Sequence, residues 1–127
     1  MRTRDDLEAY LTASSYRHEQ VAEDTWLISD TSEAGNVVVR IQDNWVIFRL
    51  KVMTLAATTK REALFEKLLS LNASDLSQAA YALMDGEVVL TSAHRLDTLD
   101  LEELRETLDE FSMAVATHHN LLHSFSA

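Results

Sequence analysis

The sequence predicts an α+β fold, a two-layer sandwich in which helices pack on one face of an antiparallel sheet. Its apolar, β-branched segments come in adjacent runs joined by short turn signals, which indicates hairpins. Amphipathic patterns precede, separate and follow these runs, so the predicted order is helix-strand-strand-strand-helix-strand-strand-helix. The 127 residues include no proline and only two glycines, and we expect residues 1–127 to form a single domain.

The first helix is predicted to begin at Thr3, because Asp6 stands three residues later in the spacing of a capping box. It is expected to end near Ser14. Three apolar side chains share one face of this helix: Leu7, Tyr10 and Leu11. A polar passage of unclear form follows. Residues 25–30 then predict a strand from their aromatic and β-branched content, and residues 31–35 predict the turn after it.

The central hairpin has the clearest register. If Asp43 and Asn44 form a two-residue turn, one side of the sheet is wholly apolar, and its facing pairs are Ile41 with Val46, Val39 with Phe48, and Val37 with Leu50. The other side mixes aromatic, aliphatic and cationic groups: Gln42 with Trp45, Arg40 with Ile47, Val38 with Arg49, and Lys51 farther along. A slip of one residue would expose the apolar set, so the pattern itself favours this register.

The second helix is predicted to begin near Thr59, with Glu62 at capping-box spacing, and to end at Asn72. Its apolar face is expected to contain Leu64, Phe65, Leu68 and Leu69. The next two strands, residues 79–84 and 87–92, flank Asp85-Gly86, a strong signal for a type I′ turn. Their expected core pairs are Tyr81 with Leu90 and Leu83 with Val88.

The final helix is predicted to open at residues 97–100, where Asp100 and Glu103 have capping spacing, and to run to about His123. Its apolar positions follow a three-four spacing: Leu101, Leu104, Leu108, Phe111, Val115, His118 and Leu122. Two interpretations stay open for this stripe. It either covers the domain's own sheet or forms a pairing seam with another helix.

The charge balance narrows the classes of function. Twenty-one acidic residues face eleven basic ones, a net charge of −10, which argues against nucleic-acid binding and against an anionic membrane surface. No cysteine is present, which excludes thiolate nucleophiles and cysteine-based zinc sites. No apolar run reaches the ~20 residues that span a bilayer. Residues 1–11 lack the apolar core of a signal peptide, so we expect a cytoplasmic protein.

Few residues suggest catalytic or metal chemistry. No phosphate loop, nucleophile elbow or other enzyme motif occurs, and we assign no catalytic residue and no cofactor. Of His118, His119 and His123, the last two lie one helical turn apart, which leaves a metal or small-ligand site as an alternative, although two ligands are too few. We therefore assign no metal residue. The carboxylate pairs Glu102-Glu103 and Asp109-Glu110 are expected on a solvated face, and residues 97–110, with seven acids, could attract a basic segment of a partner.

The non-core side of the central hairpin is the sharper functional candidate. It combines apolar anchors with arginine and lysine, and aromatic residues and arginine are enriched at protein interfaces. The predicted partner-binding or dimer surface consists of Val38, Arg40, Trp45, Ile47, Arg49 and Lys51. If the first strand pairs so that Leu27 faces inward, Trp26 and Ile28 enlarge this surface.

Four stretches resemble the YbjN-type proteins, which share the fold of type III secretion chaperones. They are residues 23–28 (Glu-Asp-Thr-Trp-Leu-Ile), 45–50 (Trp-Val-Ile-Phe-Arg-Leu), 68–72 (Leu-Leu-Ser-Leu-Asn) and 85–90 (Asp-Gly-Glu-Val-Val-Leu). The resemblance implies a non-enzymatic, dimeric protein that binds other proteins as a chaperone, adaptor or regulator. A purely structural dimeric subunit is the further alternative.

Overall fold

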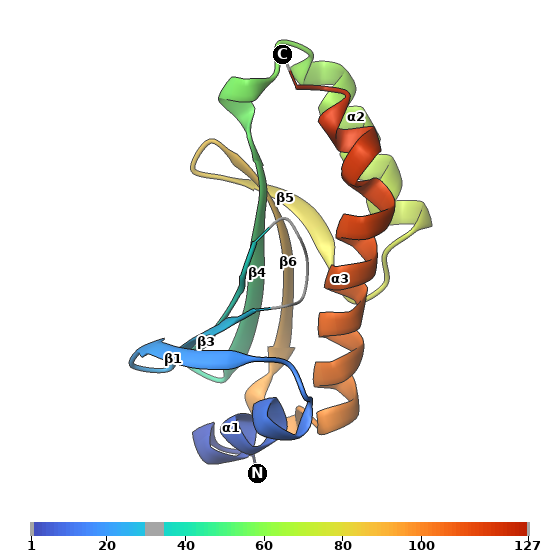
Figure 1. The fold of residues 1–127 in the computed structure, drawn as a ribbon. Coiled ribbons are helices and arrows are strands. Elements are labelled where there is room, and N and C mark those ends of the chain that lie inside the picture. Colours follow the sequence, from blue (N-terminus) through green and yellow to red (C-terminus); the bar gives the residue numbers. More distant parts are fainter. Residues whose placement is uncertain (1, 30–34, 127) are drawn as a thin grey trace.

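The computed structural model describes residues 2–29 and 35–126, and Figure 1 shows its arrangement. Its helices and strands, in chain order, are α1 (Arg4–Ala13), β1 (His18–Ala22), β2 (Thr25–Ile28), β3 (Val37–Gln42), β4 (Trp45–Thr54), α2 (Arg61–Ser74), β5 (Ala80–Met84), β6 (Glu87–Arg95) and α3 (Leu101–His123). None of the helices in these described residues is long and apolar enough to cross a membrane.

The strands form one antiparallel sheet in the order β1-β2-β3-β4-β6-β5. This confirms the predicted α+β sandwich and adds one strand, β1, which the sequence analysis left as a polar passage. β1 occupies an edge of the sheet and most of its residues are exposed. Its sequence, His-Glu-Gln-Val-Ala, therefore lacks the alternation of apolar and polar residues by which a half-buried strand is recognised.

The helices cover one side of the sheet. In Figure 1, α3 runs along β4 and β6 with α2 beside its C-terminal half, while α1 lies near the start of α3. The apolar stripe of α3 faces the sheet, and the rings of Phe111 and Phe48 meet edge to face with centroids 6.5 Å apart. Leu104, Leu108 and Phe111 are completely buried. The stripe is therefore the cover of the domain's own sheet, and its interpretation as a pairing seam is wrong.

The predicted caps of the first and last helices are confirmed. The Thr3 N–H donates to Asp6 Oδ2 at 2.8 Å, and α1 then extends to Ala13. At the start of α3, the Glu103 N–H donates to Asp100 Oδ1 at 2.8 Å. Such reciprocal bonds satisfy main-chain donors that the first turn of a helix leaves free.

The prediction for α2 was partly wrong. The helix begins at Arg61 rather than near Thr59. The hydroxyl of Thr58, not that of Thr59, accepts a hydrogen bond from the Lys60 N–H at 3.0 Å. The buried face holds Leu64, Leu68 and Leu71, whereas Leu69 is 68% exposed. The helix also continues past Asn72 to Ser74.

Asn72 has a different role from the predicted helix stop. The Tyr81 N–H donates to its Oδ1 at 2.7 Å, and its Nδ2 donates to the Tyr81 carbonyl at 3.1 Å. The side-chain amide thus pairs with the free edge of β5 as a neighbouring strand would. This tertiary contact fixes the helix rotation that buries Leu71 rather than Leu69.

The two-residue turns predicted at Asp43-Asn44 and Asp85-Gly86 are both present. Between β3 and β4, Ile41 pairs with Val46 and Val39 with Phe48, as predicted. Asp85 and Gly86 have φ values of 52° and 79°, the positive values that a type I′ turn requires. Leu83 pairs with Val88 as expected, but it is half-exposed rather than part of the core, because β5 is the edge strand of the sheet. Most of the turn predicted at residues 31–35 lies outside the described residues.

The first strand settles the alternative left open for Trp26 and Ile28. β2 pairs with β3 so that Trp26 faces Val39 and Ile28 faces Val37. Both side chains are buried, with Trp26 only 1% exposed, and Leu27 points to the opposite side. The arrangement with Leu27 inward is therefore wrong. The guanidinium of Arg4 in α1 lies 5.4 Å from the Trp26 ring centroid, within reach of a cation–π contact.

Candidate functional site

The six residues of the predicted surface all lie on the side of β3 and β4 that points away from the helices. Along β4, Val46, Phe48 and Leu50 are buried in the core, so the intervening residues must face the other way. We call the resulting surface the outer face; it consists of Val38, Arg40, Trp45, Ile47, Arg49 and Lys51. No described helix covers it in Figure 1.

The outer face carries a shallow depression of about 290 Å³. Five of the six predicted residues line it, while Trp45 stands outside it. Strand β6 and its neighbour β5 add Val89, Glu87 and Met84 to the lining, which also includes Asn36 and Gln42. The sequence did not indicate the residues from β5 and β6, because nothing in it shows that β4 pairs with β6 rather than with β5.

Trp45 is 46% exposed at the end of β4 and lies opposite Arg95 of β6. The Arg95 guanidinium stands 6.0 Å from the Trp45 ring centroid, at the limit of a cation–π contact. Arg95 also forms an ion pair with Asp97 at 3.3 Å, and its hydrogen bond, followed by one from Asn44, lowers the pKa of Asp97. Arg95 thus orients the exposed indole of Trp45 beside the depression. The sequence did not indicate this contact, because it depends on the pairing of β4 with β6.

The cations of the depression differ in how they are compensated. Lys51 Nζ lies 2.6 Å from Glu87 Oε2. Among the described residues, no carboxylate forms an ion pair with Arg40 or Arg49. The Nε of Arg49 is also buried without a hydrogen-bond partner. The outer face therefore joins exposed apolar side chains to two arginines whose charge the described chain leaves uncompensated.

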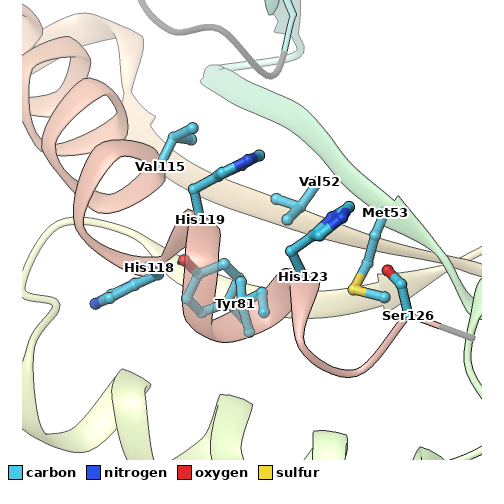
Figure 2. A pocket seen from close by; sticks show the side chains of 9 residues that line it. Val52, Met53, Tyr81, Val115, His118, His119, His123 and Ser126 are labelled. Atoms are coloured by element: carbon cyan, nitrogen blue, oxygen red, sulfur yellow. Dashed lines mark hydrogen bonds between the residues drawn. The ribbon is translucent and has the colours of Figure 1, made fainter.

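The three C-terminal histidines do not converge. Figure 2 shows His119 and His123 pointing together past Val52 and Met53, while His118 points away from them. The rings of His119 and His123 stack with centroids 5.7 Å apart, beside a pocket of about 110 Å³. Within residues 2–29 and 35–126, no group of three or more His, Cys, Asp or Glu side chains could hold a metal ion.

His118 has a structural role instead. Its Nε2 lies 2.9 Å from Asp75 Oδ2 and its Nδ1 lies 2.7 Å from the Tyr81 hydroxyl. The neutral imidazole protonated on Nε2 satisfies both bonds, because it donates to the carboxylate and accepts from the phenol. Burial, with the charge of Asp75 adding, raises the pKa of Tyr81 to about 12, and the His118 bond lowers the pKa of Asp75. This trio ties the end of α2 and strand β5 to α3.

The acidic stretch of α3 is also partly structural. The expectation that Asp109 and Glu110 lie on a solvated face was wrong for Glu110, which is buried and accepts hydrogen bonds from the loop before β5. Asp109 accepts a hydrogen bond from the Tyr16 hydroxyl; burial first and this bond second raise the pKa of Tyr16 to about 12. Asp109 and Glu110 are thus engaged by other groups of this chain, which leaves fewer carboxylates of residues 97–110 free to contact a basic partner.

Comparison with known proteins identifies the fold. The family model CesT_Tir_1 matches residues 1–127. The structure of YbjN from E. coli is similar, with 14% identity and a TM-score of 0.73 over 98% of this chain and 95% of that chain. No curated protein sequence matches significantly.

Two type III secretion proteins share the fold as well. A chain of the heterodimeric ExoU-SpcU complex from Pseudomonas aeruginosa has 17% identity and a TM-score of 0.69, over 94% of this chain and 97% of that one. A chain of the complex between the Yersinia pestis type III secretion chaperone SycH and a fragment of YscM2 has 16% identity and a TM-score of 0.57, over 98% of this chain and 100% of that one. The resemblance to YbjN-type proteins with a type III secretion chaperone fold is therefore confirmed.

Proposed function

The chain belongs to the CesT_Tir_1 family of type III chaperones, and from this premise we propose that it is a non-enzymatic chaperone or adaptor that binds a partner protein through its outer face. The structures of SpcU with ExoU and of SycH with a YscM2 fragment are complexes between two proteins. They support a protein partner for this chain, whose identity the comparisons leave open. We propose further that residues 1–127 form one cytoplasmic domain.

The observation that carries the proposal is the exposed apolar surface on the side of the sheet without helices. Trp45 and Val38 are two of the large apolar side chains that the described chain leaves exposed, and both lie on the outer face. Ile47 lies on the same face, opposite Arg40 and two residues after Trp45 along β4, and it is half-buried. An aromatic anchor beside arginine and aliphatic groups is typical of the centre of a protein interface, where a few residues contribute most of the binding energy.

The test begins with isolation of the untagged protein from its own cells and identification of the proteins that accompany it by mass spectrometry. The affinity of a purified partner is then measured by calorimetry for the wild type, for Trp45→Ala and for Met113→Ala. Met113 is 55% exposed on α3 and serves as a matched apolar control away from the outer face. We expect Trp45→Ala to weaken binding by roughly 10-fold or more, as an aromatic hot spot does, and the control to change it little.

The outcome that contradicts the proposal is equally specific. If Trp45→Ala and Met113→Ala bind the partner as tightly as the wild type, the outer face is not the binding surface. If only Met113→Ala weakens binding, the helical side of the molecule is the interface instead.

We also propose a homodimer, which the resemblance to dimeric chaperones first suggested. Light scattering at micromolar concentration tests it directly, and a strictly monomeric protein would contradict it. A dimer from which no partner can be isolated would favour the alternative of a purely structural subunit.

A further inference from the structure

We propose that the outer face recognises an acidic, extended segment of a partner protein, with its carboxylates bound by Arg40 and Arg49. This inference rests on the proposed function and specifies the chemistry of the partner. It starts from the two arginines that the described chain leaves uncompensated in the depression of the outer face.

The register places these two arginines close together. Arg40 pairs with Ile47, and Arg49 follows Ile47 by two residues on the same side of β4. Diagonal neighbours of this kind are about 7–8 Å apart in an antiparallel sheet. Two like charges at this distance on a partly apolar surface repel each other, and a bound anion would relieve the repulsion.

Other cations in the same sheet region already have acidic partners. Lys51 of β4 pairs with Glu87, and Arg95 of β6 pairs with Asp97. Arg40 and Arg49, on the same sheet, have no such partner among the described residues. The Nε of Arg49 is buried without a hydrogen-bond partner, so the chain itself does not satisfy this guanidinium fully. A guanidinium presents parallel N–H donors that match the two oxygens of a carboxylate, which makes an acidic side chain the fitting ligand.

The spacing also indicates the conformation of the segment. In an extended chain, side chains two residues apart lie on the same side and are roughly 6.5–7 Å apart. Two acidic residues at positions i and i+2 can therefore reach Arg40 and Arg49 together. Aliphatic side chains farther along the segment can contact Val38, Ile47 and Val89, which line the same depression. Excluding water in this way strengthens the charged contacts.

The probe is a fluorescein-labelled peptide built from repeats of the sequence Val-Ser-Glu-Ser-Glu-Ser-Val. The control peptide is identical except that glutamine replaces each glutamate. Fluorescence anisotropy measures the affinity of each peptide for the full chain. We expect the glutamate peptide to bind the wild type roughly 10-fold more tightly, since a carboxylate forms charge-assisted bonds with arginine that an amide does not. Both Arg49→Gln and Arg40→Gln should reduce this preference by several-fold.

Lys60→Gln supplies the matched control, because Lys60 is an exposed cation at the start of α2 and does not line the depression. It should leave the preference for glutamate unchanged. Arg40 is exposed on the sheet surface, so Arg40→Gln keeps the test valid if Arg49→Gln destabilises the domain. Thermal unfolding of each variant checks that the fold is retained.

Two results would overturn the inference. Equal affinity for the two peptides would show that the arginines do not select a carboxylate. If neither peptide is preferred and the arginine variants instead dissociate a homodimer in light scattering, the occupant is a second copy of this chain. The proposed function has its own test, because Trp45→Ala can weaken binding of the isolated natural partner whether or not acidic peptides are selected.

Discussion

Replacing Glu110 with alanine tests whether this buried carboxylate holds the loop before β5 against α3. Glu110 lies in the middle of α3, and its carboxylate accepts the main-chain N–H groups of Ser77 at 2.7 Å and Gln78 at 2.8 Å. The Ser77 hydroxyl at 3.2 Å and the Ala79 N–H at 3.4 Å are longer contacts to the same group. One side chain therefore satisfies most of the donors of a loop that connects α2 to the sheet.

The expected loss follows from the two short bonds. A hydrogen bond to a charged group contributes about 1.5–3 kcal/mol, and a donor left without a partner costs a similar amount. Ser77 is exposed and Gln78 is half-buried, so water can replace part of the lost bonding. We expect Glu110→Ala to lower the free energy of unfolding by about 3 kcal/mol. Glu110→Gln retains one acceptor oxygen and should cost about half as much.

Urea unfolding followed by the fluorescence of buried Trp26 measures this difference. The free energy of unfolding typically falls by about 2 kcal/mol per M urea, so Glu110→Ala should lower the urea concentration at the unfolding midpoint by about 1.5 M. Glu106→Gln is the control, because Glu106 is exposed and accepts a bond only from the Gln78 side chain among the described residues. If Glu110→Ala shifts the midpoint no more than this control does, the carboxylate is not what fixes the loop.

Three further predictions concern the neutral phenol, the two tryptophans and the second turn. Because the pKa of Tyr81 is raised from 10.0 to about 12, its contribution to stability is full below pH 10 and falls as the pH rises toward 12. Tyr81→Phe should remove this part of the decline in thermal melts, and an unchanged decline would contradict it. Trp26→Ala should cost about 3–5 kcal/mol in urea unfolding, whereas exposed Trp45→Ala should cost less than about 0.5; equal losses would refute the assigned burial. Gly86→Ala should cost about 1 kcal/mol through its φ of +79° alone, because a Cβ there meets no atom within 4 Å; an unaltered midpoint would count against this backbone strain.

Local signals in the sequence located the elements with strong chemistry of their own. The Thr3–Asp6 and Asp100–Glu103 spacings specify helix caps, since the capping bonds form within one turn of the chain. Asp85-Gly86 specifies a turn because both residues adopt positive φ. These features depend on neighbours within a few residues, which is why they could be predicted.

Features decided by partners distant in the chain were missed. β1 forms because β2 offers a free edge, although most of its own residues are exposed and only two are apolar. The rotation of α2 depends on the bonds between Asn72 and Tyr81 of β5. Glu110 resembles a surface residue of an acidic helix in the sequence, yet the loop before β5 buries it. His118 was placed on the apolar stripe, but its bonds to Asp75 and Tyr81 come from distant segments.

In the candidate site, some features follow from the sequence alone and others only from the tertiary structure. The alternation of apolar and polar residues along residues 37–51 by itself determined which side chains leave the core, because a strand places successive side chains on opposite faces. Only the tertiary structure decided what surrounds them. The pairing of β4 with β6 brings Val89 and Glu87 to the depression and Arg95 to Trp45. It also gives Lys51 an acidic partner and leaves Arg40 and Arg49 without one among the described residues, since strand order sets which charges become neighbours.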